Sequence, residues 1–355
     1  MSIFLKRKRL LGIDVGTSSV KAVYLESRHG DSTFTLKNYG SITTLHYIRR
    51  SEATVHEHSF KIPDIEVGDL IKDVLKIMGG PLPTQAVMSI PVHSSFITEI
   101  SLPAMRIEEI GEALEYQARH YIPVPLSEVE LDWQIVERDE KDSTKPIRVL
   151  LLAVPKGVIE RYQALAGAAK LDLQSLEIET FSLSRALLAE NPEPHIILDI
   201  GSLNSSINVV KNGIIELSHN IDTAGLSLTK TIAKTLNVNF KRAESFKREH
   251  GLEVTGGDQE AIKPLYPILD KIVTEVNRVM ASYELKQQLN VKGVVLTGGT
   301  TSMNGLLEFF KERLKVSIIL GDPWQHVTYP QELKTTMQEL GSSFAAAVGL
   351  AMKSE

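Results

Sequence analysis

The sequence predicts an α/β protein made of two similar lobes. Apolar, β-branched runs alternate with amphipathic helical segments in both halves of the 355-residue chain. A strand, turn and strand pattern around Asp14 recurs around Asp199, 185 residues later. A repeat at this spacing indicates two related units that face each other. The length agrees, because a domain takes roughly 100 to 200 residues and each half is long enough to bury its own core.

Composition excludes several classes of protein. Hydrophobic residues make up 43% and charged residues 23% of the chain, as in an ordinary globular protein. With 39 basic and 44 acidic side chains, we expect no nucleic-acid partner, since such partners require clustered basic residues. Cysteine is absent, which excludes disulfides, thiolate metal sites and cysteine nucleophiles. The longest apolar run, 149–154, is far shorter than the roughly 20 residues of a membrane-spanning helix. We therefore expect a cytoplasmic protein.

The first lobe is predicted over 1–91 and 172–194. Amphipathic spacing predicts a helix between Val67 and Ile77, ended by a glycine pair, and a buried strand follows at 86–90. Three earlier runs predict an antiparallel meander: 11–15, 20–26 and 33–39.

The pattern changes over 92–171, which we interpret as a subdomain inserted into the first lobe. Two prolines hold Ile122 to Leu126 in an extended segment, which we expect to form one wall of a groove. A rigid connector with no binding role is the alternative for this segment. The insert is predicted to contain strands at 96–101, 129–138 and 147–154 and helices around 107–114 and 158–169.

The second lobe is predicted over 195–339. After the repeated hairpin it supplies a strand at 293–297 that ends in a glycine pair, and Asn304 is expected to cap the helix that follows. Segment 340–355 is rich in small residues and is predicted to be a closing helix on the first lobe. Three further helices are predicted around 228–236, 243–249 and 269–283.

The turn after the first strand has the residues that a phosphate-binding loop needs. Gly16 allows close approach of the backbone, Thr17 and Ser18 offer hydroxyl and N–H groups, and Lys21 offers a positive charge. Asp14 suits a magnesium ion held through water, because Mg²⁺ keeps much of its hydration. Taken alone, this turn is explained equally well as a tight hairpin with a capping aspartate.

The repeat supplies an equivalent turn from the other lobe, so that two turns can hold one triphosphate. By offset, Lys21 is matched by Ser206, and only one turn therefore carries a lysine. The second turn consists of Asp199, Gly201, Ser202 and Asn204.

A third element, Gly298, Gly299 and Thr300, follows a strand at the position where ligands bind in α/β sheets. With these three elements in order, the chain resembles the actin-like ATPase superfamily. Within it, the chain most resembles the PilM family of type IV pilus assembly, a relative of cell-division FtsA. The segment 121–129 is similar to that family's inserted subdomain. The resemblance implies a duplicated, ribonuclease H-like two-lobe fold.

The resemblance also implies ATP and Mg²⁺ between the lobes. Asp14 would hold Mg²⁺ through water, with Asp199 as a possible second ligand. Glu179 falls where related ATPases place an acidic residue near the attacking water, but Glu177 lies two residues away and the two cannot be separated in the sequence. Hydrolysis is expected to be slow at most.

The remaining family positions concern the phosphates and the nucleoside. Ala224 stands where the family tends to have the first of two glycines, which would weaken binding if that backbone needs a positive φ or a very close approach of the nucleotide. The resemblance assigns Gly16, Thr17, Ser18, Lys21, Gly201, Ser202, Asn204 and Gly225 to the phosphate side, and Glu244, Lys247, Gly298, Gly299 and Thr300 to the adenosine.

Two functions compete. The family implies an assembly protein that binds the short cytoplasmic tail of a PilN-like inner-membrane protein between the first lobe and the insert, in a nucleotide-dependent way. Membrane association would then occur only through this partner, and self-association stays open. The alternative is a sugar kinase of the same superfamily, whose opening motif is similar. Such kinases are usually longer and carry a second carboxylate as the base for the sugar hydroxyl. The insert has no obvious sugar-binding cluster of Trp, Asp and Asn, and its only tryptophan is Trp133. The cysteine-ligated activator ATPases of this fold are excluded.

Overall fold

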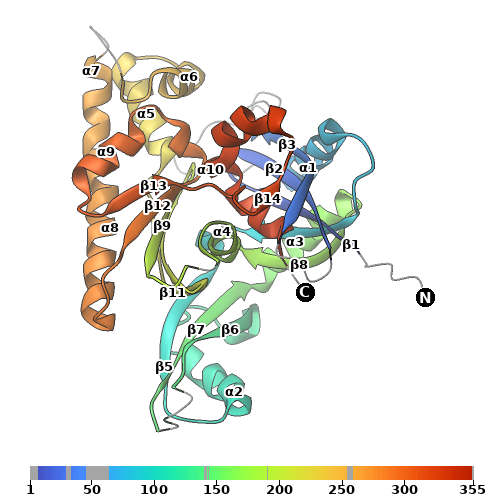
Figure 1. Ribbon diagram of the computed structural model, residues 1–355, viewed down its shortest axis with the longest axis vertical. Coiled ribbons are helices and arrows are strands. Elements are labelled where there is room, and N and C mark those ends of the chain that lie inside the picture. The colour runs from blue at the N-terminus through green and yellow to red at the C-terminus, as the bar shows by residue number, and fades with distance from the viewer. Residues whose placement is uncertain are drawn as a thin grey trace.

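The computed structural model describes residues 7–28, 33–44, 64–139, 142, 144–189, 191–253 and 259–353. These residues form two lobes, each with its own sheet, and a third, smaller sheet that projects from the lower end of the molecule in Figure 1. Within the described ranges, none of the helices combines the length and apolarity that crossing a bilayer requires.

The first lobe contains a six-stranded sheet in the order β14-β3-β2-β1-β4-β8. The predicted antiparallel meander is confirmed, and β4 and β8 continue the sheet parallel to β1. Helix α1 (Asp64–Met78) ends where predicted, because Gly79 and Gly80 adopt positive φ angles. The strands are β1 (Arg7–Val15), β2 (Ser19–Arg28), β3 (Phe34–Thr43), β4 (Gln85–Ile90), β8 (Asp172–Ile178) and β14 (Val327–Thr328).

The second lobe repeats this topology in a five-stranded sheet of order β11-β10-β9-β12-β13. Asp14 pairs with Lys21 across the first hairpin, and Asp199 pairs with Ser206 across the second. The duplication and the predicted offset are therefore confirmed in the strand register. The strands are β9 (His195–Ile200), β10 (Ser205–Lys211), β11 (Ile214–Ile221), β12 (Gly293–Thr297) and β13 (Ser317–Leu320).

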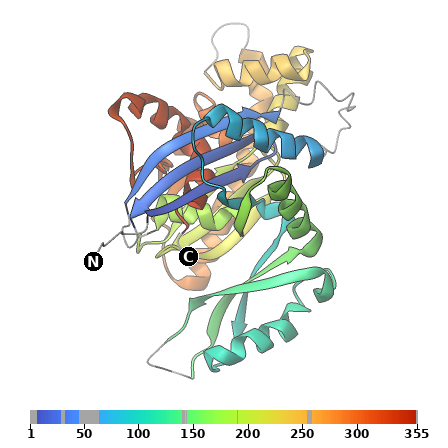
Figure 2. The ribbon, with the colours of Figure 1, turned by 90° about the vertical axis from the view of Figure 1, so that its right-hand side faces the viewer.

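The insert is a three-stranded antiparallel sheet of order β5-β7-β6 with helix α2 (Ile107–Ala118) against it, seen at the bottom of Figure 2. Its core is separate from that of the first lobe. The strands are β5 (Phe96–Leu102), β6 (Val129–Glu137) and β7 (Ile147–Pro155).

Helix α3 (Lys156–Ala168), which we assigned to the insert, packs on the first lobe. Its Tyr162 and Leu165 are buried in the same cluster as Val67 and Leu70 of α1. The division at 92 and 171 stays a prediction, and this packing favours an end of the insert near 155.

Two helices, α4 (Glu179–Leu188) and α10 (Lys334–Ala351), pack against each other near the centre of the molecule (Figure 1). Glycines permit their close contacts. A Cβ on Gly349 would lie 1.9 Å from the Ser182 carbonyl oxygen, and one on Gly12 of β1 would lie 2.2 Å from that of Ala347. The closing helix on the first lobe is confirmed, and it begins six residues before the predicted start, at Lys334 instead of 340.

The other helices cover the second lobe. The prediction that Asn304 caps α9 is wrong, because Gly305 occupies the N-cap with φ of 76° and the Asn304 side chain instead donates to the carbonyl oxygen of Glu249. The helices are α5 (Gly225–Leu236), α6 (Phe240–His250), α7 (Gln259–Ile262), α8 (Tyr266–Gln287) and α9 (Leu306–Arg313).

Candidate functional site

A cleft between the two lobes brings together the residues that the sequence analysis selected. The two hairpin turns face it from opposite lobes, and the turn after β12 and helix α6 complete its wall. Every predicted site residue lines this cleft: Asp14, Gly16, Thr17, Ser18, Lys21, Glu179, Asp199, Gly201, Ser202, Asn204, Gly225, Glu244, Lys247, Gly298, Gly299 and Thr300.

The first turn is held tight by its backbone, since the N–H of Gly16 donates to the carbonyl oxygen of Ser19 at 3.0 Å. Asp14 is 7% exposed and accepts a hydrogen bond from Ser89 Oγ at 2.9 Å. Lys21 Nζ lies 3.6 Å from Asp14 Oδ2. A carboxylate and an ammonium group therefore stand side by side at the base of the turn.

The second turn repeats the geometry, with the Gly201 N–H donating to the Asn204 carbonyl oxygen at 3.1 Å. The Gly225 N–H at the start of α5 donates to the Gly201 carbonyl oxygen at 3.1 Å. Asn204 Nδ2 donates to Asp222 Oδ1 at 2.8 Å. The turn is thus fixed to the N-terminus of α5 and to the end of β11.

Glycines allow the segments of the second lobe to approach each other at this point. Gly298 has φ of 97°, and a Cβ there would lie 2.2 Å from Asp199 Oδ1. A Cβ on Gly225 would lie 2.4 Å from Thr300 Oγ1, which itself donates to the Gly201 carbonyl oxygen at 2.7 Å. No larger residue fits at either glycine without displacing the cleft wall.

Ala224 does not need the conformational freedom of glycine. Its backbone is extended, with φ of −161° and ψ of −166°, a region open to any residue. The first condition under which we expected Ala224 to weaken binding, a positive φ, is therefore not met, and the second, a very close approach of the nucleotide, stays a prediction. The close approach occurs one residue later, at Gly225.

Three carboxylates gather between the turns. Burial raises the pKa of Glu179 to about 8, and the neighbouring Asp199 and Asp14 add to this by repulsion. Burial, with repulsion from Asp14, raises the pKa of Asp199 to about 6, while Lys21 acts in the opposite direction. In the part of the chain that the structure describes, no three His, Cys, Asp or Glu side chains are grouped to hold a metal directly.

The tertiary structure separates Glu179 from Glu177. Glu179 is the first residue of α4, and its Oε1 accepts from the Val92 backbone N–H at 3.1 Å. Glu177 instead forms a two-pronged ion pair with Arg185, at 2.8 and 2.9 Å, and a third contact with Lys353 at 2.9 Å. Only Glu179 lines the cleft.

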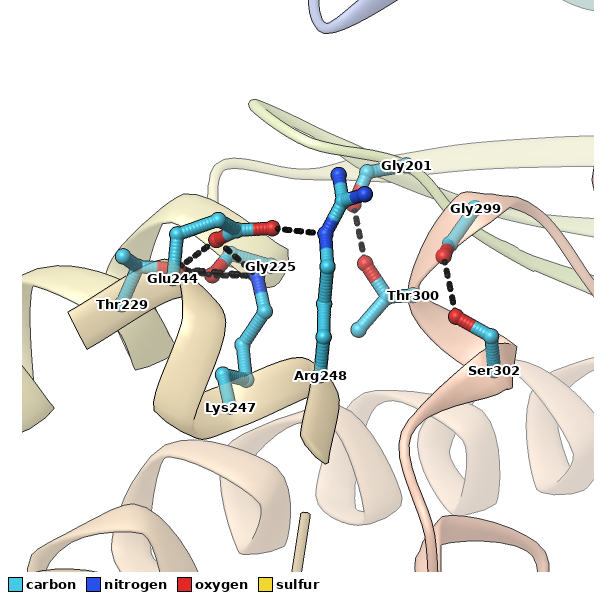
Figure 3. Close-up of polar contacts among 9 residues, drawn as sticks. All are labelled: Gly201, Gly225, Thr229, Glu244, Lys247, Arg248, Gly299, Thr300 and Ser302. Carbon is cyan, nitrogen blue, oxygen red and sulfur yellow. Dashed lines mark hydrogen bonds and ion pairs between the residues drawn. The ribbon is translucent and has the colours of Figure 1, made fainter. Parts of the chain in front are cut away.

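At the other end of the cleft, α6 carries a compact polar cluster, shown in Figure 3. Lys247 Nζ contacts Glu244 Oε2 at 2.7 Å, Thr229 Oγ1 at 2.8 Å and the Gly225 carbonyl oxygen at 3.2 Å. All three ammonium protons thus have partners within the protein. Burial alone would raise the pKa of Glu244, but the positive charge of Lys247 holds this pKa below its usual range. Lys247 therefore positions Glu244 and the start of α5.

Sequence reasoning missed several residues of the cleft. Arg248 Nε donates to Glu244 Oε1 at 2.8 Å, and its terminal nitrogens point away from Glu244 (Figure 3). Its spacing of four residues from Glu244 on one helix was a usable signal. His93 and Ser342 also line the cleft, but they come from the short helix Val92–Ser94 and from the C-terminal helix and carry no local motif.

A second hollow lies between the insert and the first lobe, and we call it the groove. Two sheet-edge strands, β6 and β8, line it together with β7, α3 and α4. The oxygen of the Gln134 side chain, on β6, is buried without a hydrogen-bond partner among the described residues. Apolar residues of the groove include Leu131, Trp133, Leu152, Leu173, Leu176 and Phe181.

The expectation that Ile122 to Leu126 forms a wall of this groove is wrong. Ile122 is 6% exposed and belongs to the core of the insert, and Val124 and Leu126 pack against the same core. The segment is also not extended throughout, because the chain bends at Pro123 and Val124 and a short 3-10 helix begins at Leu126, and its apolar side chains pack in the same core as residues of α2 and β7. The wall on the insert side is β6.

Comparison with known proteins gives consistent matches. A family model described as type IV pilus assembly protein PilM matches residues 12–355. Cell division protein FtsA of Streptococcus pneumoniae serotype 2 (strain D39) is 21% identical over 347 residues, covering 88% of this chain and 75% of FtsA. The solved PilM-PilN type IV pilus biogenesis complex matches with a TM-score of 0.82 and 24% identity, over 98% of both chains. MreB5 of Spiroplasma citri bound to AMPPNP matches with a TM-score of 0.50 and 13% identity, over 96% of this chain and 94% of that chain.

The structural matches agree with the duplicated topology and show an actin-like fold. The family match covers both lobes, the insert and the closing helix. The chain therefore belongs to the type IV pilus assembly protein PilM family.

Proposed function

We propose that this chain is an actin-like assembly protein of type IV pili that binds ATP with Mg²⁺ between its lobes and a PilN-like peptide in the groove. The observation that carries the nucleotide assignment is the pair of matching glycine turns, which face each other across a cleft with Asp14, Glu179, Asp199 and Lys21 at its base.

The residues at the base of the cleft fit a magnesium triphosphate. Lys21 and the N–H and hydroxyl groups of Thr17 and Ser18 would bind phosphate oxygens, and Asp14 and Asp199 would hold the waters of the cation. Bound Mg²⁺ would neutralise phosphate charge. Glu179 has a raised pKa and keeps its proton at neutral pH in the absence of a cation. In that state it would be unable to accept a proton from the attacking water, and we expect slow hydrolysis at most.

The nucleoside would lie against α6 and the turn after β12. Glu244 is fixed by three neighbours and can accept a further hydrogen bond from a ribose hydroxyl. Arg248 offers a planar cation at the mouth of the cleft. Thr300 and the backbone at Gly299, beside which the structure is open, would face the base.

The groove fits an extended apolar peptide. Among the described residues, no further strand pairs with the outer edges of β6 and β8, so these edges can hydrogen-bond to a peptide backbone, and Trp133 and Phe181 offer apolar contacts. PilN is named with PilM in the solved complex of similar fold. A PilN-like cytoplasmic tail is therefore the proposed occupant, and it would bring this protein to the membrane.

Two titrations test the proposal. Calorimetry should show that the chain binds Mg²⁺ and ATP, with an affinity that falls in Lys21→Ala and is unchanged in Lys234→Ala, a lysine on the exposed side of α5. A labelled peptide copying the tail of the PilN-like protein from the same organism should bind, and Trp133→Ala should weaken it. Absence of ATP binding would refute the nucleotide site, and absence of peptide binding would refute the partner.

A further inference from the structure

Helix α4 forms part of the wall of both the cleft and the groove. Its Glu179 and Leu183 line the nucleotide cleft, whereas its Phe181 and Arg185 line the groove. The helix lies at the centre of the molecule in Figure 1, and α10 packs along it. Any displacement of α4 therefore changes both cavities.

A second connection begins at the end of β4. The short helix η2 (Val92–Ser94) starts the insert, and the Glu179 carboxylate accepts the backbone N–H of its first residue, Val92, at 3.1 Å. The next residue, His93, lines the cleft and lies near enough to Asp222 of the second lobe for an electrostatic interaction between the two side chains. The start of the insert is therefore fastened to the acidic centre of the cleft.

An apolar cluster continues this connection to the groove. Val92 is 2% exposed and belongs to the same buried cluster as Leu183 of α4 and Val136 and Leu152 of the insert. Leu152 also lines the groove. An unbroken series of contacts thus leads from Glu179 through Val92 to the groove wall.

We propose that α4 and the hydrogen bond from Val92 to Glu179 couple the two cavities, so that nucleotide in the cleft and peptide in the groove change each other's affinity. This inference rests on the proposed function and adds the route by which its two ligands communicate. A terminal phosphate and its hydrated cation in the cleft would act on the Glu179 carboxylate, and the carboxylate cannot move without altering its contact with Val92. Glu179 is in this respect a positioning residue for the insert.

Coupling of this kind is reciprocal. If nucleotide changes the peptide dissociation constant by some factor, the peptide must change the nucleotide dissociation constant by the same factor. We expect that factor to be about 5 or more between the ADP and AMPPNP states, within the usual range for coupled sites. Both directions can be measured with the labelled PilN-like tail peptide and calorimetry.

The variants isolate the route. Glu179→Ala removes the acceptor and should reduce the coupling factor to less than about 2, whereas Glu179→Gln keeps an acceptor oxygen for Val92 and should preserve more of it. Leu131→Ala is the matched control, because Leu131 lines the groove from β6 and is not part of α4. Leu131→Ala should lower the affinity for the peptide by the same factor in every nucleotide state. Phe181→Leu provides a second test should Glu179→Ala fail to fold, and it should change the coupling factor although Phe181 does not line the cleft.

The outcomes separate this inference from the proposed function. A peptide that binds with one affinity in all nucleotide states refutes the coupling and leaves the proposed function intact. A peptide that binds in no state refutes the proposed partner. Full coupling in both Glu179→Ala and Phe181→Leu refutes the route through α4.

Discussion

Replacing Lys21 by methionine tests the electrostatic arrangement of the cleft. Lys21 Nζ lies 3.6 Å from Asp14 Oδ2, and the charge of Lys21 also partly offsets the rise in the pKa values of Glu179 and Asp199. The side chains of Lys21 and Asp14 are only 13% and 10% exposed, so solvent screens the pair little. Lys21→Met keeps the apolar stem and removes the charge.

The expected size follows from the distance. At an effective dielectric constant of about 20, two unit charges 3.6 Å apart attract by about 5 kcal/mol. Part of this is offset because burying the ammonium group itself costs free energy, so we expect a net loss of about 1–3 kcal/mol in the free energy of unfolding at pH 8. The loss should be smaller at pH 5, since Glu179 and Asp199, whose pKa values are raised, then carry protons and need no counter-charge.

Urea unfolding of the wild type and Lys21→Met at pH 5 and pH 8, without nucleotide, measures this difference. Calorimetry at pH 8 should also show ATP binding weakened by about 1–3 kcal/mol, as for other charge-assisted contacts. Lys234→Met is the matched control and should behave as the wild type. Equal destabilisation at both pH values, or unchanged ATP affinity, would refute the charge arrangement proposed for the first turn.

Four further predictions follow from the cleft and the insert. The affinity for Mg²⁺ and ATP should rise between pH 6 and pH 8 as Glu179 loses its proton. Calorimetry should show a flatter pH profile in Glu179→Gln, and comparing the two profiles cancels the titration of ATP itself, which is the same in both. Gly298→Ala should lower the free energy of unfolding in urea by about 2–4 kcal/mol, because its Cβ would meet Asp199 at a positive φ, while Gly299→Ala has open space and should cost far less. Replacing 92–155 by a short glycine-serine linker should abolish binding of the labelled peptide and leave ATP binding detectable by calorimetry; peptide binding of wild-type strength would place the docking site elsewhere. Finally, no hexose, pentose or polyol should raise ADP release in a coupled assay to the roughly 1–100 per second of a kinase, and an acceptor that did so would support the sugar-kinase alternative.

Local patterns in the sequence were sufficient for most of the secondary structure and for the two hairpin turns and the glycine pair of the cleft, whereas Glu179, Glu244 and Lys247 were assigned through the family resemblance. The meander, the repeated hairpin and the strand before Gly298 follow from alternation of apolar residues and from glycine positions, which depend on near neighbours along the chain. The register of Asp14 with Lys21 could be transferred to Asp199 because the two hairpins are copies. Their meeting in one cleft follows from the duplication itself.

Contacts between distant segments decided the rest. Glu177 and Glu179 have the same chemistry, and only the start of α4 between them directs one toward Arg185 and the other toward the cleft. The prolines of 122–126 fix a backbone shape and do not fix which core its side chains enter.

The same limit applies to helices that are amphipathic in isolation. The apolar stripe of α3 predicts a buried face, but only the packing shows that Tyr162 belongs to the first lobe. The family resemblance placed Lys247 beside the nucleoside, whereas the folded cluster gives its three protons to Glu244, Thr229 and Gly225. The sequence therefore determines which residues can bind a charged ligand. Tertiary structure decides which hydrogen-bond partners these residues have within the protein, because burying an unpaired polar group costs free energy.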